Sequence, residues 1–143
     1  MTAETETIRF TADVVAVTDD QRVLLIERGW PPYEGMWALP GGHVDEDEER
    51  EPERAAAREL AEETGVRVDP SDLILLGRWD APGRDPRGRY VTYAYLARVP
   101  ADTVSIAGDD ARATRWVPLG APGDLAFDHN QIVAAAWRQS ITR

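Results

Sequence analysis

The stretch "GGHVDEDEEREPERAAARELAEETGV", from Gly41 to Val66, joins a glycine pair, an acidic segment and a strong helix pattern. Six of the seven residues from Asp45 to Glu51 are Asp or Glu, and the glutamates Glu59, Glu62 and Glu63 follow. Like charges this close repel one another. The stretch is therefore either a solvated acidic surface or a site that waits for a cation.

Helix geometry separates the three later glutamates from the acidic segment. We predict a helix over Pro52–Thr64, because a proline suits the first turn, strong helix formers follow, and Gly65 suits the end. At 3.6 residues per turn, Glu63 lies about 40° from Glu59, and Glu62 lies about 60° to the other side. Such neighbours destabilise a helix by about 0.2–0.5 kcal/mol per pair. An acidic helix face is often only a solvated one, but a hard divalent cation such as Mg²⁺ would offset this repulsion.

The rest of the chain predicts a mixed sheet between two separated helices, an α/β fold with helix, sheet and helix layers. We expect a single domain over residues 1–143, with roughly the first ten residues frayed, residues 1–7 in particular. The predicted strands and the short extended piece are Phe10–Thr18, Arg22–Arg28, Trp37–Leu39, Leu73–Trp79, Arg89–Val99 and Arg115–Pro118. The second helix is predicted over Asp128–Ile141, with Asp128 and Gln131 resembling a capping box.

Composition excludes several functional classes. The net charge is −10, from 16 basic and 26 acidic residues, which argues against non-specific binding of nucleic acid. No apolar run approaches the roughly 20 residues of a membrane span, and no secretory signal is visible. The chain has no cysteine, so disulfides and thiolate metal ligands are excluded. We therefore expect a cytoplasmic protein with neither a nucleic-acid nor a membrane partner.

The second half of the opening stretch resembles the signature of the Nudix (MutT-like) hydrolases, G-x5-E-x7-R-E-U-x-E-E-x-G-U, in which U is apolar. The first half departs from this pattern, because 15 residues separate Gly42 from Arg58, two more than the pattern has. Counting forward from the glycine gives Glu48 as the motif glutamate. Either Glu48 or Glu49 could fill that position. The matching residues of the second half are Arg58, Glu59, Leu60, Glu62, Glu63, Gly65 and Val66.

Three flanking stretches extend the resemblance to the branch of Nudix proteins related to ADP-ribose pyrophosphatases. They are "RGWPPYEGMWALPGGHVDEDE", "APGRDPRGRYVTYAYLARV" and "LAFDHNQI". The resemblance implies an α/β/α sandwich around a mixed sheet, with the box as a loop-helix-loop. It also implies hydrolysis of the pyrophosphate bond in a nucleoside diphosphate linked to another moiety, with ADP-ribose or a similar nucleotide sugar as the small-molecule substrate. A MutT-like nucleoside triphosphate pyrophosphohydrolase is the alternative on substrate.

The resemblance also assigns roles to the box residues. Glu59, Glu62 and Glu63 would bind Mg²⁺ or Mn²⁺, together with the Gly41 carbonyl and with Glu48 or Glu49. Arg58 would hold a box carboxylate through a bidentate pair. We expect Arg58, Glu59 and Glu62 to be catalytic. The alternative class is a Nudix ligand sensor fused to a DNA-binding domain; the intact glutamates and the short chain favour an enzyme.

The remaining candidates lie on loops. Arg84, Arg87 and Arg89 are candidate contacts to phosphate or ribose, and Trp30 and Tyr33 are candidates for stacking on a base. Trp37 could also stack on a base but is expected to pack in the core or against the loop, and Phe10 is a weaker stacking candidate. Asp109 and Asp110 are either the general base or ordinary turn residues, and His43 and His129 are expected to be structural. Related ADP-ribose enzymes are often dimers that share site residues, so a homodimer is a further expectation.

Overall fold

Seven strands, two α-helices and two short 3₁₀ helices make up residues 7–141, the part of the chain that the computed structural model describes. The strands are β1 (Ile8–Thr18), β2 (Arg22–Arg28), β3 (Trp37–Ala38), β4 (Gly41–His43), β5 (Ile74–Trp79), β6 (Arg89–Val99) and β7 (Ala111–Pro118). The helices are η1 (Glu46–Glu48), α1 (Pro52–Thr64), η2 (Pro70–Asp72) and α2 (His129–Ile141). No described helix has the length and apolar character to cross a membrane.

The sheet is mixed and runs in the order β3-β2-β1-β6-β5, with β4 beside β1 and β7 beside β2. β1 and β6 are parallel along their whole length, whereas the other pairs are antiparallel. Both faces of β1 are covered, which explains its nearly continuous apolar run. The mixed sheet predicted from the sequence is therefore confirmed.

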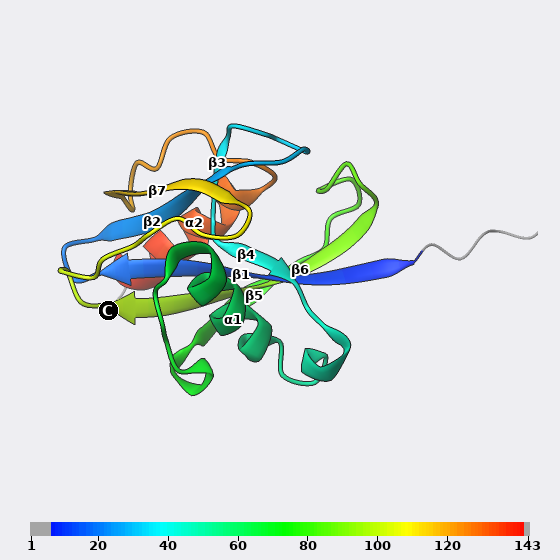
Figure 1. Cartoon of the computed structure of the whole chain (residues 1–143), viewed down its shortest axis with the longest axis horizontal. Helices are drawn as coiled ribbons and strands as arrows, with labels where there is room; N and C mark the ends of the chain where they lie inside the picture. Colours follow the sequence, from blue (N-terminus) through cyan, green and yellow to red (C-terminus); the bar gives the residue numbers. More distant parts are fainter. Residues whose placement is uncertain (1–6, 142–143) are drawn as a thin grey trace, which may run out of the picture.

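The two helices cover opposite faces of this sheet (Figure 1). Val15 and Val17 of β1 pack with Ile132 of α2, whereas Val14 and Ala16 belong to the core that contains Leu60 and other apolar residues of α1. Successive side chains of a strand point to opposite faces, so one strand serves both layers. This arrangement confirms the expected α/β/α layering.

The sheet is split beside β1, where β2 pairs with one end of the strand and β4 with the other, and the candidate site lies at this split. β1 pairs with β2 only near Val17 and Val23. At the other end of β1, β4 takes the place of β2, with Thr11 opposite His43 and Asp13 opposite Gly41. The chain that passes through this split carries Leu39 and the glycine pair between the two helical layers.

The structure corrects three details of the sequence prediction. Ile8–Phe10 is not frayed but lies in β1, because β6 is long enough to pair with it; residues 1–6 lie outside the described residues. β4 was not predicted, since two of its three residues are glycines that carry no strand pattern. β7 begins at Ala111 rather than Arg115, because β2 supplies a partner for residues whose own pattern is weak.

Candidate functional site

The site begins with the C-terminal half of α1. Leu60 is fully buried and fixes the helix on the sheet, which turns the neighbouring glutamates toward the split. Glu62 is the outermost of them, with its side chain 43% exposed, whereas the Glu59 side chain is 13% exposed. The helix ends at Gly65, which adopts a left-handed φ of 73° and donates its N–H to Ala61.

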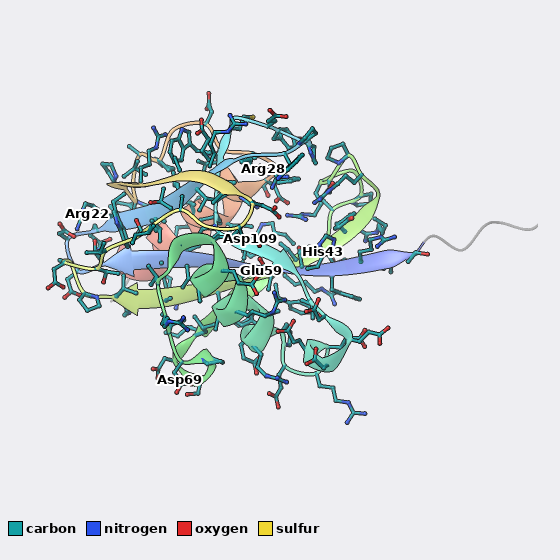
Figure 2. The ribbon with its side chains drawn as sticks, viewed as in Figure 1. Arg22, Arg28, His43, Glu59, Asp69 and Asp109 are labelled. Carbon is teal, nitrogen blue, oxygen red and sulfur yellow. The ribbon has the colours of Figure 1, made fainter. Side chains whose placement is uncertain are left out.

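Carboxylate oxygens of Glu59, Glu62 and Asp109 come within 4.8 Å of one another. Figure 2 shows Glu59 and Asp109 beside each other, although one lies on α1 and the other on the loop between β6 and β7. Oxygen ligands of this kind suit Mg²⁺ and Mn²⁺. Burial raises the pKa of Glu59, and nearby Glu62 and Asp109 raise it further. A divalent cation would relieve this repulsion, so the donor set fits the metal that the sequence implied.

The loop that carries Asp109 is fixed to the end of α1. The N–H of Ile106 donates to the Thr64 carbonyl at 2.9 Å, and the N–H of Gly108 donates to the Glu63 carbonyl at 3.0 Å. A Cβ on Gly108 would lie 2.6 Å from the carbonyl oxygen of Glu62, so the approach requires glycine. The sequence indicated Asp109 as either a general base or a turn residue but not as a metal ligand, since nothing in its spacing relates it to the helix.

Glu63 faces a different direction from the other two glutamates. It is buried, and its Oε1 accepts a hydrogen bond of 2.8 Å from the N–H of Gly41. Burial raises the pKa of Glu63 to about 8, against an ordinary 4.5, despite that hydrogen bond. Glu63 lines the cavity described below, so the structure places it beside the carboxylate cluster rather than within it.

Arg58 ties the acidic loop to the helix. Its guanidinium donates two hydrogen bonds to Glu48, each 2.9 Å, and one of 2.8 Å to Glu59. These contacts hold the pKa of Glu48 below its usual range, with the Arg58 hydrogen bond as the main cause. Of the two loop glutamates left open by the sequence, Glu48 is the one that Arg58 binds, whereas Glu49 is exposed. The loop between Gly42 and Arg58, which is two residues longer than the pattern, contains the short helix η1.

Gly41 and Gly42 lie so close to acidic side chains that a larger residue would not fit. A Cβ on Gly42 would collide with the carboxylate of Glu59, and one on Gly41 would collide with Asp13. Either collision would disturb the cavity or the cluster. These glycines therefore allow the backbone of β4 to lie directly against the functional carboxylates.

A cavity of about 300 Å³ lies in the split of the sheet next to the cluster. Of the predicted residues, Trp30, Gly41, Glu63, Arg84 and Arg87 line it, whereas Tyr33 and Arg89 are not among its lining residues. Sequence reasoning assigned no binding role to other lining residues, since they lie on strands and loops far apart in the chain. These include Asp13, Arg28, His43, Phe127 and His129, and Asp110 also lines it.

The three predicted arginines have different surroundings. Arg84 is almost fully buried and makes a bidentate pair with Asp128, at 2.6 and 2.8 Å. Both carboxylate oxygens of Asp128 thus accept hydrogen bonds from Arg84. The sequence had predicted that this side chain would cap the second helix. Arg87 pairs with Asp85 and lies 4.7 Å from the ring centre of Tyr90. Arg89 donates to the Asp80 carbonyl.

Of the aromatic residues that the sequence singled out, Trp30 lines the cavity, whereas the others pack against neighbouring side chains. Trp30 is 65% exposed at the cavity, whereas Tyr33 packs edge-on against Phe127 at 4.8 Å. Trp37 packs against the core, as predicted. Phe10 stacks on Tyr93, with ring centres 6.0 Å apart.

Comparison with known proteins agrees with this arrangement. The NUDIX domain model matches residues 7–136. An ADP-ribose pyrophosphatase from Methanocaldococcus jannaschii is 38% identical over 117 residues, which are 82% of this chain and 66% of that protein. The ADPR responsive transcriptional repressor NtrR from Acinetobacter baylyi is 33% identical over 132 residues, 89% of this chain and 52% of that protein. This chain thus spans about two thirds of the first relative and half of the second.

Solved structures extend the similarity to the fold. The NUDIX domain of Shewanella oneidensis NrtR, crystallised with ADP ribose, has a TM-score of 0.83 and 33% identity, covering 94% of this chain and 90% of that one. A MutT/nudix family protein from Enterococcus faecalis has a TM-score of 0.86 and 32% identity, covering 100% and 66%. With the family model matching nearly the whole chain and the box residues arranged around the split sheet, this chain belongs to the Nudix family.

Proposed function

We propose that this protein is a divalent-metal-dependent pyrophosphohydrolase that cleaves the pyrophosphate bond of ADP-ribose or a similar nucleotide sugar. The observation that carries this proposal is the convergence of Glu59, Glu62 and Asp109 within 4.8 Å, next to an arginine-lined cavity. The named activity of the M. jannaschii relative and the ADP ribose bound to the Shewanella domain support the substrate class.

The carboxylate cluster would hold Mg²⁺ or Mn²⁺, with Glu59, Glu62 and Asp109 as ligands. The cation would neutralise the substrate phosphates and lower the pKa of a bound water. Arg58 would keep Glu59 in place through its 2.8 Å hydrogen bond. Glu63, Glu48 and the Gly41 carbonyl stay as further proposed ligands. Glu49 is exposed, and we assign it no role.

Two guanidinium groups support binding of an anion in the cavity. Arg28 and Arg87 both line the cavity. The pKa of Arg28 is lowered, mainly because the side chain is buried and secondly because the positive charge of Arg87 is nearby. Two cations that destabilise each other would be stabilised by a phosphate between them. We propose these two side chains as the phosphate contacts, with Trp30 as a stacking surface, and give Arg84 the role of supporting the wall.

The proton of the attacking water needs an acceptor. Asp110 lines the cavity and directly follows Asp109, which the cluster already uses. We therefore propose Asp110 as the general base among the two aspartates that the sequence singled out. Its conversion to Asn should lower kcat by about 100-fold and leave KM within a few fold.

A ligand sensor is the second candidate, since the chain is 33% identical to a repressor described as ADPR responsive. Incubation with Mg²⁺ or Mn²⁺ and a panel of ADP-ribose, NADH, sugar nucleotides and nucleoside triphosphates separates the candidates. Release of AMP and ribose phosphate supports our proposal, and release of pyrophosphate from a triphosphate favours the MutT-like alternative. Binding of ADP-ribose without turnover of any panel member supports the sensor. A cytoplasmic location and a homodimer stay predictions.

A further inference from the structure

Two ionisable side chains meet on the floor of the cavity without a place in the reaction described above. Asp13 lies on the α2-facing side of β1, and His129 is the first residue of α2. Both line the cavity, and they are 6% and 4% exposed. Polar groups buried this far are retained only with hydrogen-bond partners, so the partners of each group reveal what it still lacks.

The hydrogen bond to His129 fixes where its proton lies. The Nδ1 atom accepts a 3.0 Å hydrogen bond from the N–H of Leu39, so it carries no proton. Burial lowers the pKa of His129, which favours the neutral ring. The proton therefore sits on Nε2, and this N–H is a donor.

That donor faces the cavity. The distance from His129 Nε2 to Asp13 Oδ2 is 3.7 Å, which is beyond hydrogen-bond range. Among residues 7–140, whose side chains the structure describes, no side-chain nitrogen or oxygen is both fully buried and without a partner. The Nε2 atom must therefore be accessible, and the cavity is what it reaches.

The Asp13 carboxylate has the complementary property. Its Oδ2 accepts a 2.6 Å hydrogen bond from the Thr92 hydroxyl, the one side-chain donor to this carboxylate among the described residues. A carboxylate offers about four acceptor positions, so capacity remains. An acceptor and a donor, 3.7 Å apart and accessible from one cavity, match a single hydroxyl oxygen that lies about 2.8 Å from each.

We propose that Asp13 and His129 form a subsite that binds one hydroxyl group of a ribose in the nucleotide substrate. The hydroxyl accepts from His129 Nε2 and donates to Asp13 Oδ2. Thr92, behind the carboxylate, fixes its orientation. This inference rests on the proposed function, which brings a ribose-containing diphosphate into the cavity, and it adds the residues that select for intact sugar hydroxyls.

A substrate that lacks the hydroxyl would leave His129 Nε2–H without an acceptor and would leave Asp13 with Thr92 as its one side-chain donor among the described residues. For the wild-type protein, we expect kcat/KM to fall by about 100-fold when the contacted hydroxyl is absent. Two analogues of ADP-ribose locate it, one deoxygenated on the adenosine ribose and one on the terminal ribose. The analogue with the larger loss identifies the sugar, and equal turnover of both analogues and ADP-ribose would overturn the subsite.

Variants distinguish recognition from a structural role. In Asp13→Asn and in His129→Gln, the penalty for the missing hydroxyl should shrink to a few fold, because the partner is already lost. Thr18→Val is the matched control, since Thr18 is a buried polar residue at the far end of β1 and does not line the cavity. It should keep the full penalty. Equal losses on hydroxylated and deoxygenated substrates in Asp13→Asn would show a merely structural residue.

The ligand comparison also separates this inference from the proposed function. If ADP-ribose is bound but not hydrolysed, calorimetric affinities for the same three ligands replace kcat/KM, and the same differences are expected. If the three ligands bind equally well, the subsite is wrong even where hydrolysis is confirmed. If the protein neither binds nor hydrolyses these three ligands or any sugar nucleotide of the panel, both proposals are wrong. The wild-type comparison needs no variant, so a variant that fails to fold does not affect it.

Discussion

At the scale of single residues, the raised pKa of Glu63 makes the stability of the protein depend on pH. This pKa is about 8 in the fold and near the ordinary 4.5 in the unfolded chain. Between these values the folded protein binds the extra proton, so the free energy of unfolding falls as pH rises. This loss is absent below about pH 4.5 and complete above about pH 8, in metal-free protein.

Glu63→Gln removes this titration. We expect the variant, in EDTA, to melt at a higher temperature than wild type at pH 8, with the difference vanishing near pH 5. The gain should be on the order of a few kcal/mol, because burial of the charge is the cause. Glu49→Gln, at an exposed site, serves as the control and should follow wild type. Parallel melting curves of wild type and Glu63→Gln across this range would contradict the assigned burial.

Glu62 tests activity rather than stability. Its side chain is 43% exposed, so substituting it should leave the fold intact. We expect Glu62→Gln to lower kcat by about 100-fold or more with either metal, through loss of a ligand charge. Circular dichroism should show an unchanged fold. Activity of the variant within a few fold of wild type would exclude Glu62 from the metal site.

At the scale of elements, the contact between α1 and the β6–β7 loop determines whether the cluster exists. Asp109 reaches Glu59 only because Ile106 and Gly108 bond to the last carbonyls of the helix. Asp109 also adopts a left-handed φ of 51°, which costs little for an aspartate. The geometry of the loop is therefore part of the metal site.

Gly108→Ala tests this contact. The added Cβ would lie 2.6 Å from the Glu62 carbonyl oxygen, so the loop must move away and carry Asp109 with it. We expect Mn²⁺ affinity, measured by electron paramagnetic resonance, to fall about tenfold, while the melting temperature of the metal-free protein changes little. Ala107→Ser adds one atom at an exposed neighbouring position and should bind Mn²⁺ like wild type. Unchanged Mn²⁺ affinity in Gly108→Ala would show that the geometry of this loop does not contribute to metal binding.

At the scale of the whole molecule, acidic residues give a net charge of −10, and several lie together at the split of the sheet. A cation that binds only the folded protein stabilises it in proportion to ligand excess. At a 100-fold excess over Kd, Mg²⁺ should raise the melting temperature by about 5 °C or more. NaCl at equal ionic strength controls for general screening and should give a smaller shift. The doubly substituted Glu62→Gln, Asp109→Asn protein should respond to both salts alike; a retained Mg²⁺-specific shift would place the cation elsewhere.

The sequence by itself determined the helix, its acidic face and the family. Those properties are local: the spacing of Glu59, Glu62 and Glu63 follows from 3.6 residues per turn, and Gly65 ends the helix wherever it packs. The bounds of β2, α1 and β6 were predicted correctly for the same reason, since each has a strong pattern of its own.

Only the tertiary structure decided which carboxylates meet. Asp109 joins the cluster through the path of a loop, Glu63 acquires its high pKa through burial, and Asp13 and His129 meet because β1 and α2 pack face to face. Strand register and packing set these contacts between residues far apart in the chain, and no spacing within the sequence encodes them. The Gly41–Val66 stretch thus supplies the ligands of one helix, while the split sheet supplies their partners and the cavity.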